Sequence, residues 1–238
     1  MRVSALVAVV FLAGCDLVFG LAEREPSTVQ DASTANLIRW YKMDGLEGGR
    51  LVDAAASGHD GLCAPPACPT VATGVVDGAL RFDGMTQLVR SASDAALEGP
   101  GPFTVALWAY AEDTTNFACV VSKLLGTGVY NSWALCRDAS GRWDFVTRTE
   151  ELWVPEPTLQ GGWHHLAIRW DGMTKSISVD GVDKVESPGT MTSDGGDLVI
   201  GGDVDDGVPS IIFPGVIDDL RIYNRALSDE ELTELAAR

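Results

Sequence analysis

Short runs of apolar or alternating residues recur along the chain from Leu37 almost to its end. Alternation with a period of two is typical of a β-strand, and Val, Ile, Trp and Phe, which favour strands, are frequent in these runs. The pattern predicts strands at 37–43, 79–82, 86–90, 103–111, 117–123, 132–137, 142–148, 163–170, 175–180, 197–201, 211–217 and 219–223.

Turn residues separate these runs. Eight Asp-Gly dipeptides begin at Asp44, Asp60, Asp77, Asp83, Asp171, Asp180, Asp194 and Asp206. Asp-Gly readily adopts the positive φ angles of tight hairpin turns, so many short strands joined by such turns predict a sandwich or barrel. A single short helix is expected at the C-terminus, where Ser228 and Glu231 form a capping box before Leu232 and Leu235.

The first residues are typical of an export signal. Met1 and Arg2 precede an apolar run from Val3 to Ala13 that is too short to span a membrane. Leu12-Ala13-Gly14-Cys15 resembles the lipobox of bacterial lipoproteins. We therefore expect a signal peptide at 1–14, a lipidated Cys15, and a flexible polar tether over 15–36. An ordinary signal peptide with an incidental cysteine is the alternative.

Lipidation of Cys15 would anchor the protein to a membrane of the cell envelope. We favour the outer membrane or the cell surface over the inner membrane, although the sequence leaves the leaflet open. Acidic residues outnumber basic ones 34 to 17, which gives a net charge of −17. Such a charge repels a phosphate backbone and argues against nucleic acid as a partner, whereas cations, neutral sugars and basic proteins stay open.

Four cysteines remain besides Cys15, and an exported protein meets an oxidising compartment. Cys63 and Cys68 bracket an Ala-Pro-Pro-Ala turn, and Cys119 and Cys136 lie at equal offsets from the middle of a predicted hairpin. We expect two disulfides among these four cysteines, for which the sequence alone allows three connectivities. A zinc site is disfavoured, because paired Cys-x-x-Cys spacing and nearby histidines are missing.

Six stretches of sequence follow one another in the order of a known family. They are Asp53…Ser57-Gly58-His59-Asp60-Gly61, Gly78–Gly84 (GALRFDG), Phe103–Trp108 (FTVALW), Gly162–Ala167 (GWHHLA), Val179-Asp180-Gly181 and Gly215–Ser228 (GVIDDLRIYNRALS). Together they resemble the laminin G-like jelly-roll modules of the concanavalin A-like lectin/glucanase superfamily, from about Leu37 to Leu235. The resemblance implies a domain at 37–238 that is an all-β, two-sheet antiparallel jelly-roll sandwich with a short C-terminal helix.

The same resemblance implies calcium near the rim of the sandwich. Position by position it points to Asp53, Asp60, Asp218 and Asp219 as ligands, and oxygen-rich loops of this kind suit calcium. The alternative is that these residues form turns and accept hydrogen bonds from backbone amides. His59 stands where the family usually has Asn, which removes one oxygen ligand.

The sequence argues against catalysis. Glycosidases of this superfamily carry Glu-x-Asp-x-x-Glu on one strand, and that string does not occur here. Asp180–Glu186 comes nearest but has the wrong spacing, on a predicted turn. His164 and His165 lack an accompanying nucleophile motif, and the resemblance makes both structural.

Ligand binding is the remaining role for the seven tryptophans. Trp40, Trp108, Trp163 and Trp170 fall on predicted strands and are expected in the core, whereas Trp133, Trp143 and Trp153 are less constrained. Two predicted loops, 124–131 and 149–157, carry Tyr130 and Trp153, which we take as the candidate ligand-binding residues, because exposed aromatic groups often mark interaction sites.

These observations favour a lipid-anchored, non-catalytic recognition module that binds carbohydrate or protein at the cell envelope and is stabilised by calcium. A structural or adhesive spacer is the alternative, and a glycoside hydrolase ranks third. Aromatic and acidic loop residues gathered on one surface would favour recognition, and their dispersal would favour the spacer.

Overall fold

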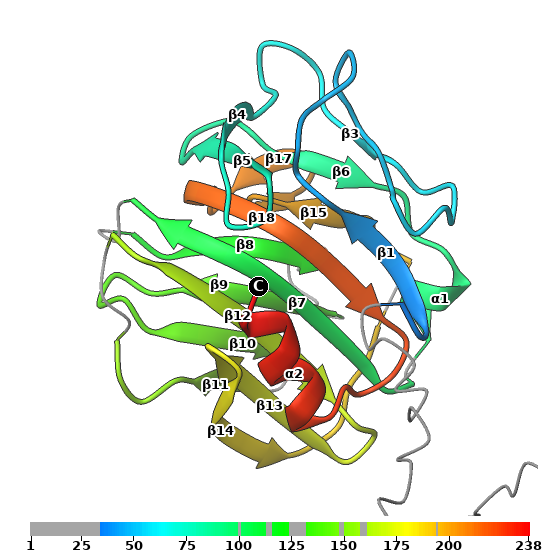
Figure 1. The fold of residues 1–238 in the computed structure, drawn as a ribbon, viewed down its shortest axis with the longest axis vertical. Coiled ribbons are helices and arrows are strands. Elements are labelled where there is room, and N and C mark those ends of the chain that lie inside the picture. The colour runs from blue at the N-terminus through cyan, green and yellow to red at the C-terminus, as the bar shows by residue number, and fades with distance from the viewer. Residues whose placement is uncertain are drawn as a thin grey trace, which may run out of the picture. The chain divides into compact units, whose positions relative to one another are not determined.

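The computed structural model describes residues 34–99, 101–112, 116–123, 132–147, 150–157, 161–193 and 195–238. Two antiparallel sheets face each other in this part of the chain, and a helix lies on the outside of one of them (Figure 1). A search of the same residues for a helix with the length and apolar character needed to cross a membrane finds none. The predicted all-β, two-sheet sandwich with a short C-terminal helix is confirmed.

Sheet A contains both terminal strands. Its order is β14-β13-β12-β7-β18-β5-β4, and β1 also pairs with β18. The strands are β1 Leu37–Tyr41, β4 Thr70–Thr73, β5 Gly78–Asp83, β7 Phe103–Ala111, β12 Trp163–Trp170, β13 Thr174–Val179, β14 Val182–Pro188 and β18 Pro214–Tyr223. The pairing of β1 with β18 places the first and last strands side by side.

Sheet B has the order β11-β10-β9-β8-β15-β6-β3-β2. Its strands are β2 Arg50–Leu51, β3 Gly61–Leu62, β6 Val89–Ser91, β8 Ala118–Lys123, β9 Trp133–Arg137, β10 Trp143–Thr147, β11 Glu151–Trp153 and β15 Leu198–Ile200. A separate hairpin joins β16 Asp203–Asp205 to β17 Val208–Ser210. The Ser122 hydroxyl in β8 donates to Asp203 (2.9 Å), which ties this hairpin to sheet B.

The core fills the space between the sheets. Alternate residues of each strand point inward, as in Leu107 and Ala109 of β7 or Trp143 and Phe145 of β10, and all four are buried. Burial of apolar surface at about 25 cal/mol per Å² is the main favourable term in folding. The residues between them in sequence therefore point to the two outer faces, although several of them, such as Trp108 and Asp144, are buried as well.

The C-terminal helix covers part of the outer face of sheet A. Helix α2, Asp229–Ala236, begins with the predicted capping box between Ser228 and Glu231. Leu232 and Leu235 are buried together with Leu227, which confirms that the helix is a terminal clasp. Figure 1 shows α2 (red) in front of β7 and β12.

Several elements differ from the sequence prediction. The predicted strands 211–217 and 219–223 form one strand, β18, with a bulge between Asp218 and Arg221 where Asp219 has a φ of 48°. The strands β2, β3, β4, β11, β14, β16 and β17 and the four-residue helix α1, Ala95–Glu98, were not predicted. Most of these are two to four residues long, too short for a period to be recognised.

The tryptophans only partly follow the prediction. Trp108 and Trp170 are buried as expected, but Trp40 and Trp163 are only half-buried. The less constrained Trp133 and Trp143 are core residues, 3% and 1% exposed.

Both disulfides are present. Cys63 bonds to Cys68, and Cys119 bonds to Cys136, which selects one of the three connectivities that the sequence allows.

Candidate functional site

Trp153 lies on a strand rather than in a loop. β11 pairs with β10 at the edge of sheet B, and the register places Trp153 opposite Asp144 and Glu151 opposite Val146. Leu152 between them points into the core. The predicted loop over 149–157 is therefore wrong for 151–153, but alternation along β11 still places Trp153 on the outer face, where it is half-buried.

Three neighbours hold the Trp153 ring in place. The Arg142 guanidinium lies 5.0 Å from the ring centre, a cation–π contact. The indole N–H donates to the Glu151 carboxylate (3.1 Å), and the ring meets Phe117 edge-on at 6.3 Å. Arg142 is fixed in turn by Asp138, whose Oδ2 accepts from its Nε and from one Nη (2.9 and 2.7 Å). The ring is thus pre-oriented, which lowers the entropy cost of binding against it.

Asp144 lies beside Trp153 and has no partner. Its side chain is fully buried, and neither carboxylate oxygen makes a hydrogen bond. The nearby Leu152 amide acts to lower the pKa of Asp144, but its geometry does not meet that of a hydrogen bond. Burial, reinforced by the charge of Glu151, raises the pKa of Asp144 to about 7. A buried carboxyl without a partner is unfavourable for folding, and such groups concentrate at functional sites.

The opposite neighbour of Asp144 is a disulfide. Cys136 of β9 faces Asp144 across the strand pair, and the Cys119–Cys136 bond is buried with Ala134 and Val146 in a small apolar cluster. This cluster forms a rigid floor for the surface made by Phe117, Arg142, Asp144, Glu151 and Trp153, which we call the Trp153 patch.

The predicted calcium ligands do not come together. In the loop between β2 and β3, Asp53 Oδ1 accepts from the amides of Trp40 and Ala55 (both 3.0 Å). Asp60 accepts from the amide of Asp53 (2.8 Å) and from Nε of Arg50 (2.6 Å). These carboxylates accept hydrogen bonds from the backbone and from arginine, as the alternative interpretation expected.

Asp218 and Asp219 also have protein partners. Asp218 Oδ2 accepts from the amides of Val75 and Val76 (2.7 and 2.8 Å), and Asp219 Oδ1 accepts from the indole N–H of Trp40 (2.7 Å). Over the described ranges, no three His, Cys, Asp or Glu side chains are arranged to hold a metal ion. The four aspartates do not fit a shared calcium cage, and calcium binding stays a prediction from the resemblance alone.

Two predicted sites lie outside the described residues, namely the lipidated Cys15 and the candidate ligand-binding Tyr130. The histidines have structural surroundings. His165 is buried, which lowers its pKa to about 4, and it packs edge-on against Trp108 at 5.3 Å. His164 Nδ1 lies 2.9 Å from the Asp180 carboxylate at the adjoining turn.

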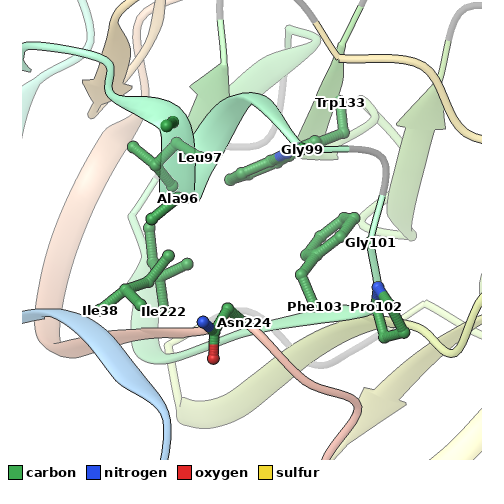
Figure 2. A pocket seen from close by; sticks show the side chains of 11 residues that line it. Ile38, Ala96, Leu97, Gly99, Gly101, Pro102, Phe103, Trp133, Ile222 and Asn224 are labelled. Atoms are coloured by element: carbon green, nitrogen blue, oxygen red, sulfur yellow. The ribbon is translucent and has the colours of Figure 1, made fainter.

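A pocket of about 250 Å³ opens at one end of the sandwich (Figure 2). Phe103 and Trp133, stacked at 5.4 Å, form one wall, and Ile38, Leu97 and Ile222 lie across the opening. Among the described residues of the lining, the polar side-chain groups are the Asn224 amide and the indole N–H of Trp133, and none is ionisable. The pocket offers few groups that could orient a polar ligand, so the Trp153 patch is the stronger candidate site.

Sequence reasoning missed most of the Trp153 patch. Asp144 and Arg142 were part of a predicted strand, and their types carry no motif. Their one signal is a charged residue between the inward-facing Trp143 and Phe145, which places Asp144 on the outer face. Its lack of a partner is visible only in three dimensions.

Comparisons with known proteins agree with the fold. A family model described as "Concanavalin A-like lectin/glucanases superfamily" matches residues 83–233, more than half of the chain. Among curated proteins, the rat "Sushi, von Willebrand factor type A, EGF and pentraxin domain-containing protein 1" is 28% identical over 156 residues. That match covers 60% of this chain but only 4% of the much longer rat protein.

Solved structures with low sequence identity share the architecture. Domain 4 of AbnA, an extracellular arabinanase of Geobacillus stearothermophilus solved with arabinotriose, has a TM-score of 0.66 at 19% identity, and the match covers 85% of this chain and 99% of that domain. Trypanosoma rangeli sialidase has a TM-score of 0.68 at 18% identity, over 85% of this chain and 32% of the sialidase. The binding domain of Paraclostridial Mosquitocidal Protein 1 has a TM-score of 0.68 at 11% identity, over 86% of this chain and 52% of that one. The family match, in the order of strands described above, identifies the chain as a member of the concanavalin A-like lectin/glucanase superfamily.

Proposed function

We propose that the chain is a non-catalytic recognition module that binds carbohydrate at the Trp153 patch. The observation that carries this proposal is the gathering of two aromatic rings, an arginine and the exposed Glu151 on one outer face, beside the buried Asp144, which has no hydrogen-bond partner among the described residues. Aromatic rings stack on sugar rings, and the charged groups around them can accept and donate hydrogen bonds. A clustered surface favours recognition over the spacer alternative.

A domain of similar fold, solved in complex with arabinotriose, supports carbohydrate as the ligand class. The alternative within the same proposal is that the ligand is a protein. The binding domain of Paraclostridial Mosquitocidal Protein 1, which has a similar fold, shows that this fold serves as a binding domain in another protein. Calcium is not part of the proposal, because the four predicted ligands have other partners.

The proposal is tested by removing the ring. Trp153→Ala should weaken binding to the best glycan found in a screen of plant and cell-wall polysaccharides by about tenfold or more, since truncating a central aromatic residue typically costs 2 kcal/mol or more. Trp163→Ala, which removes a half-buried ring from the outer face of sheet A, is the matched control and should leave affinity unchanged. Equal affinities of both variants and the parent protein would exclude the Trp153 patch as the binding site.

We further propose that Cys15 carries a lipid that anchors this module at the cell envelope, on the outer membrane or cell surface. The support is the lipobox-like Leu12-Ala13-Gly14-Cys15. Cys15→Ala in the full chain should shift the protein from the membrane pellet to the soluble fraction, because it removes the acceptor thiol. An unchanged pellet fraction would refute the anchor.

Glycoside hydrolysis is a second candidate, favoured by one observation. Asp144, with a raised pKa, and Glu151 lie on the same face of sheet B, and a protonated acid beside a carboxylate is the arrangement that glycosidases use. The oxygens of Asp144 are closed to solvent, which disfavours direct proton transfer to a substrate. Release of reducing ends that stops in Asp144→Asn would establish hydrolysis and displace the recognition proposal.

A further inference from the structure

The Trp153 patch carries more negative than positive charge. Asp138, Asp144 and Glu151 contribute three carboxyl groups, and Arg142 contributes one guanidinium. Arg142 donates two hydrogen bonds to Asp138, whose pKa these contacts and those of Ser140 lower to about 2 against the opposing effect of burial. The arginine charge is therefore already balanced within the protein. Among the described residues, Asp144 and Glu151 both lie next to Trp153 and form no ion pair of their own.

Asp144 is the group that a cation would stabilise most. A buried carboxylate is unfavourable unless it is paired. Among the described residues neither oxygen of Asp144 has a hydrogen-bond partner, and the positive charge that acts on it, Arg142, is shared with Asp138. A positive group against Trp153 would interact with Asp144, with Glu151 and with the negative face of the ring. A negative group in the same place would face two carboxyl groups, and the described cation beside the ring, Arg142, already pairs with Asp138; like-charge contacts in an interface are strongly unfavourable.

We propose that the Trp153 patch selects glycans that carry a cationic nitrogen, such as those with free amino sugars, over neutral glycans and rejects glycans with carboxylate or sulfate groups. The inference rests on the proposed carbohydrate recognition and names its ligand class. The net charge of −17 acts in the same direction at long range and makes the preference depend on salt. The sialidase neighbours share the fold, but this charge pattern separates the chain from ligands with a carboxylate.

The test compares three oligosaccharides that share one backbone and differ only in the charge of their substituent. Chito-oligosaccharides of equal length, bearing N-trimethyl, N-acetyl or N-succinyl groups, supply a fixed cation, a neutral group and an anion. Calorimetric titration at pH 7.5 and low salt should rank them in that order, with about tenfold between the cationic and neutral ligands. The preference should shrink in high salt.

Two conservative variants connect the preference to the patch. Glu151→Gln and Asp144→Asn should each reduce the ratio of cationic to neutral affinity by about threefold, whereas Glu47→Gln, at the opposite edge of sheet B, should leave the ratio unchanged. The affinity of the N-trimethyl oligosaccharide, whose charge does not change with pH, can also be measured as a function of pH. This affinity should rise between pH 6 and pH 8 in the parent protein, where Asp144 ionises next to Glu151, Asp138 and Arg142, and should stay level in Asp144→Asn.

The outcomes separate the two proposals. Absence of binding by all three oligosaccharides and by a wider glycan screen would overturn carbohydrate recognition and this inference with it. Neutral or anionic ligands binding as tightly as the cationic one would overturn only the inference. A lysine-rich peptide that binds more tightly than the cationic oligosaccharide would replace the glycan by a basic protein partner.

Discussion

Two buried carboxylates on the outer faces of the two sheets show how one residue type can have different roles. Asp218 of β18 lies on sheet A and Asp144 of β10 lies on sheet B, and both side chains are fully buried. Asp218 Oδ2 accepts two backbone amides, whereas Asp144 accepts none. Burial raises both pKa values, to about 6 for Asp218 and about 7 for Asp144, and the amide bonds account for the smaller rise at Asp218.

The difference lies in what each carboxylate stabilises. Asp218 attaches the segment of Val75 and Val76 to the strand that also pairs with β7 and β5, so its burial is compensated by the loop that it orders. Asp144 accepts no hydrogen bond from any residue that the structure describes. A buried polar group that holds no structure in place destabilises the fold, and its presence is explained more directly by binding than by folding.

The largest expected effect separates the two residues by stability. Asp218→Ala leaves two buried amides without an acceptor, and each such loss costs about 1–3 kcal/mol, so the free energy of unfolding should fall by about 2–6 kcal/mol at pH 7.5. Asp144→Ala should lower it by less than about 1 kcal/mol or raise it, because no hydrogen bond is lost and an unfavourable buried charge is removed. Urea denaturation of both variants measures the difference. Similar losses of unfolding free energy in the two variants would contradict the claim that only Asp218 stabilises the fold.

Sequence reasoning reached the residues that pattern and motif describe. The alternation in 103–111 and 163–170, the capping box at Ser228 and the hairpin offsets of Cys119 and Cys136 each have a local signature, and each is found in the structure. Trp153 was selected as a candidate for ligand binding, although its strand was mistaken for a loop.

What the sequence could not give depends on contacts between distant segments. The hydrogen bonds from Val75 and Val76 to Asp218 join residues more than 140 positions apart, and no local pattern predicts them. The calcium hypothesis failed to gain support for the same reason, because acidic residues near glycine look alike whether they serve an ion or a backbone amide. The missing partner of Asp144 is likewise a property of its surroundings.

The next effect is a dependence of stability on pH. A carboxyl with a pKa of about 7 in the folded state and about 3.9 in the unfolded state binds its proton more tightly when folded. Its contribution is therefore fully present below pH 4 and is lost as the pH rises through 7. Between pH 5.5 and pH 7.5 this loss amounts to about 2 kcal/mol, and Asp144→Asn should remove it.

The two carboxylates change the free energy of unfolding over different pH ranges, so a variant of one serves as the control for the other. The Asp218 contribution is lost as the pH rises through about 6, and the lowered pKa of His165 acts in the opposite direction, mainly below pH 6.5. The fall in stability above pH 6.5 therefore belongs mainly to Asp144. Urea denaturation at half-unit pH steps should show a slope above pH 6.5 in Asp218→Asn but not in Asp144→Asn. A slope that persists in Asp144→Asn would mean that another group titrates there.

The smallest effect is expected from calcium. Asp53 and Asp60 are occupied by amides and an arginine, and Asp218 has only Oδ1 free of hydrogen bonds. An ion without a cage of oxygens binds weakly and stabilises the fold little by mass action, so 1 mM calcium chloride should change the melting temperature of residues 16–238, made without lipid, by less than about 1 °C relative to a chelator. A rise of several degrees that disappears in Asp218→Asn would show that Oδ1 binds the ion. Asp218 would then bind a ligand, as we infer for Asp144. The two carboxylates would differ in which ligand they bind, and no longer in whether they serve folding or binding.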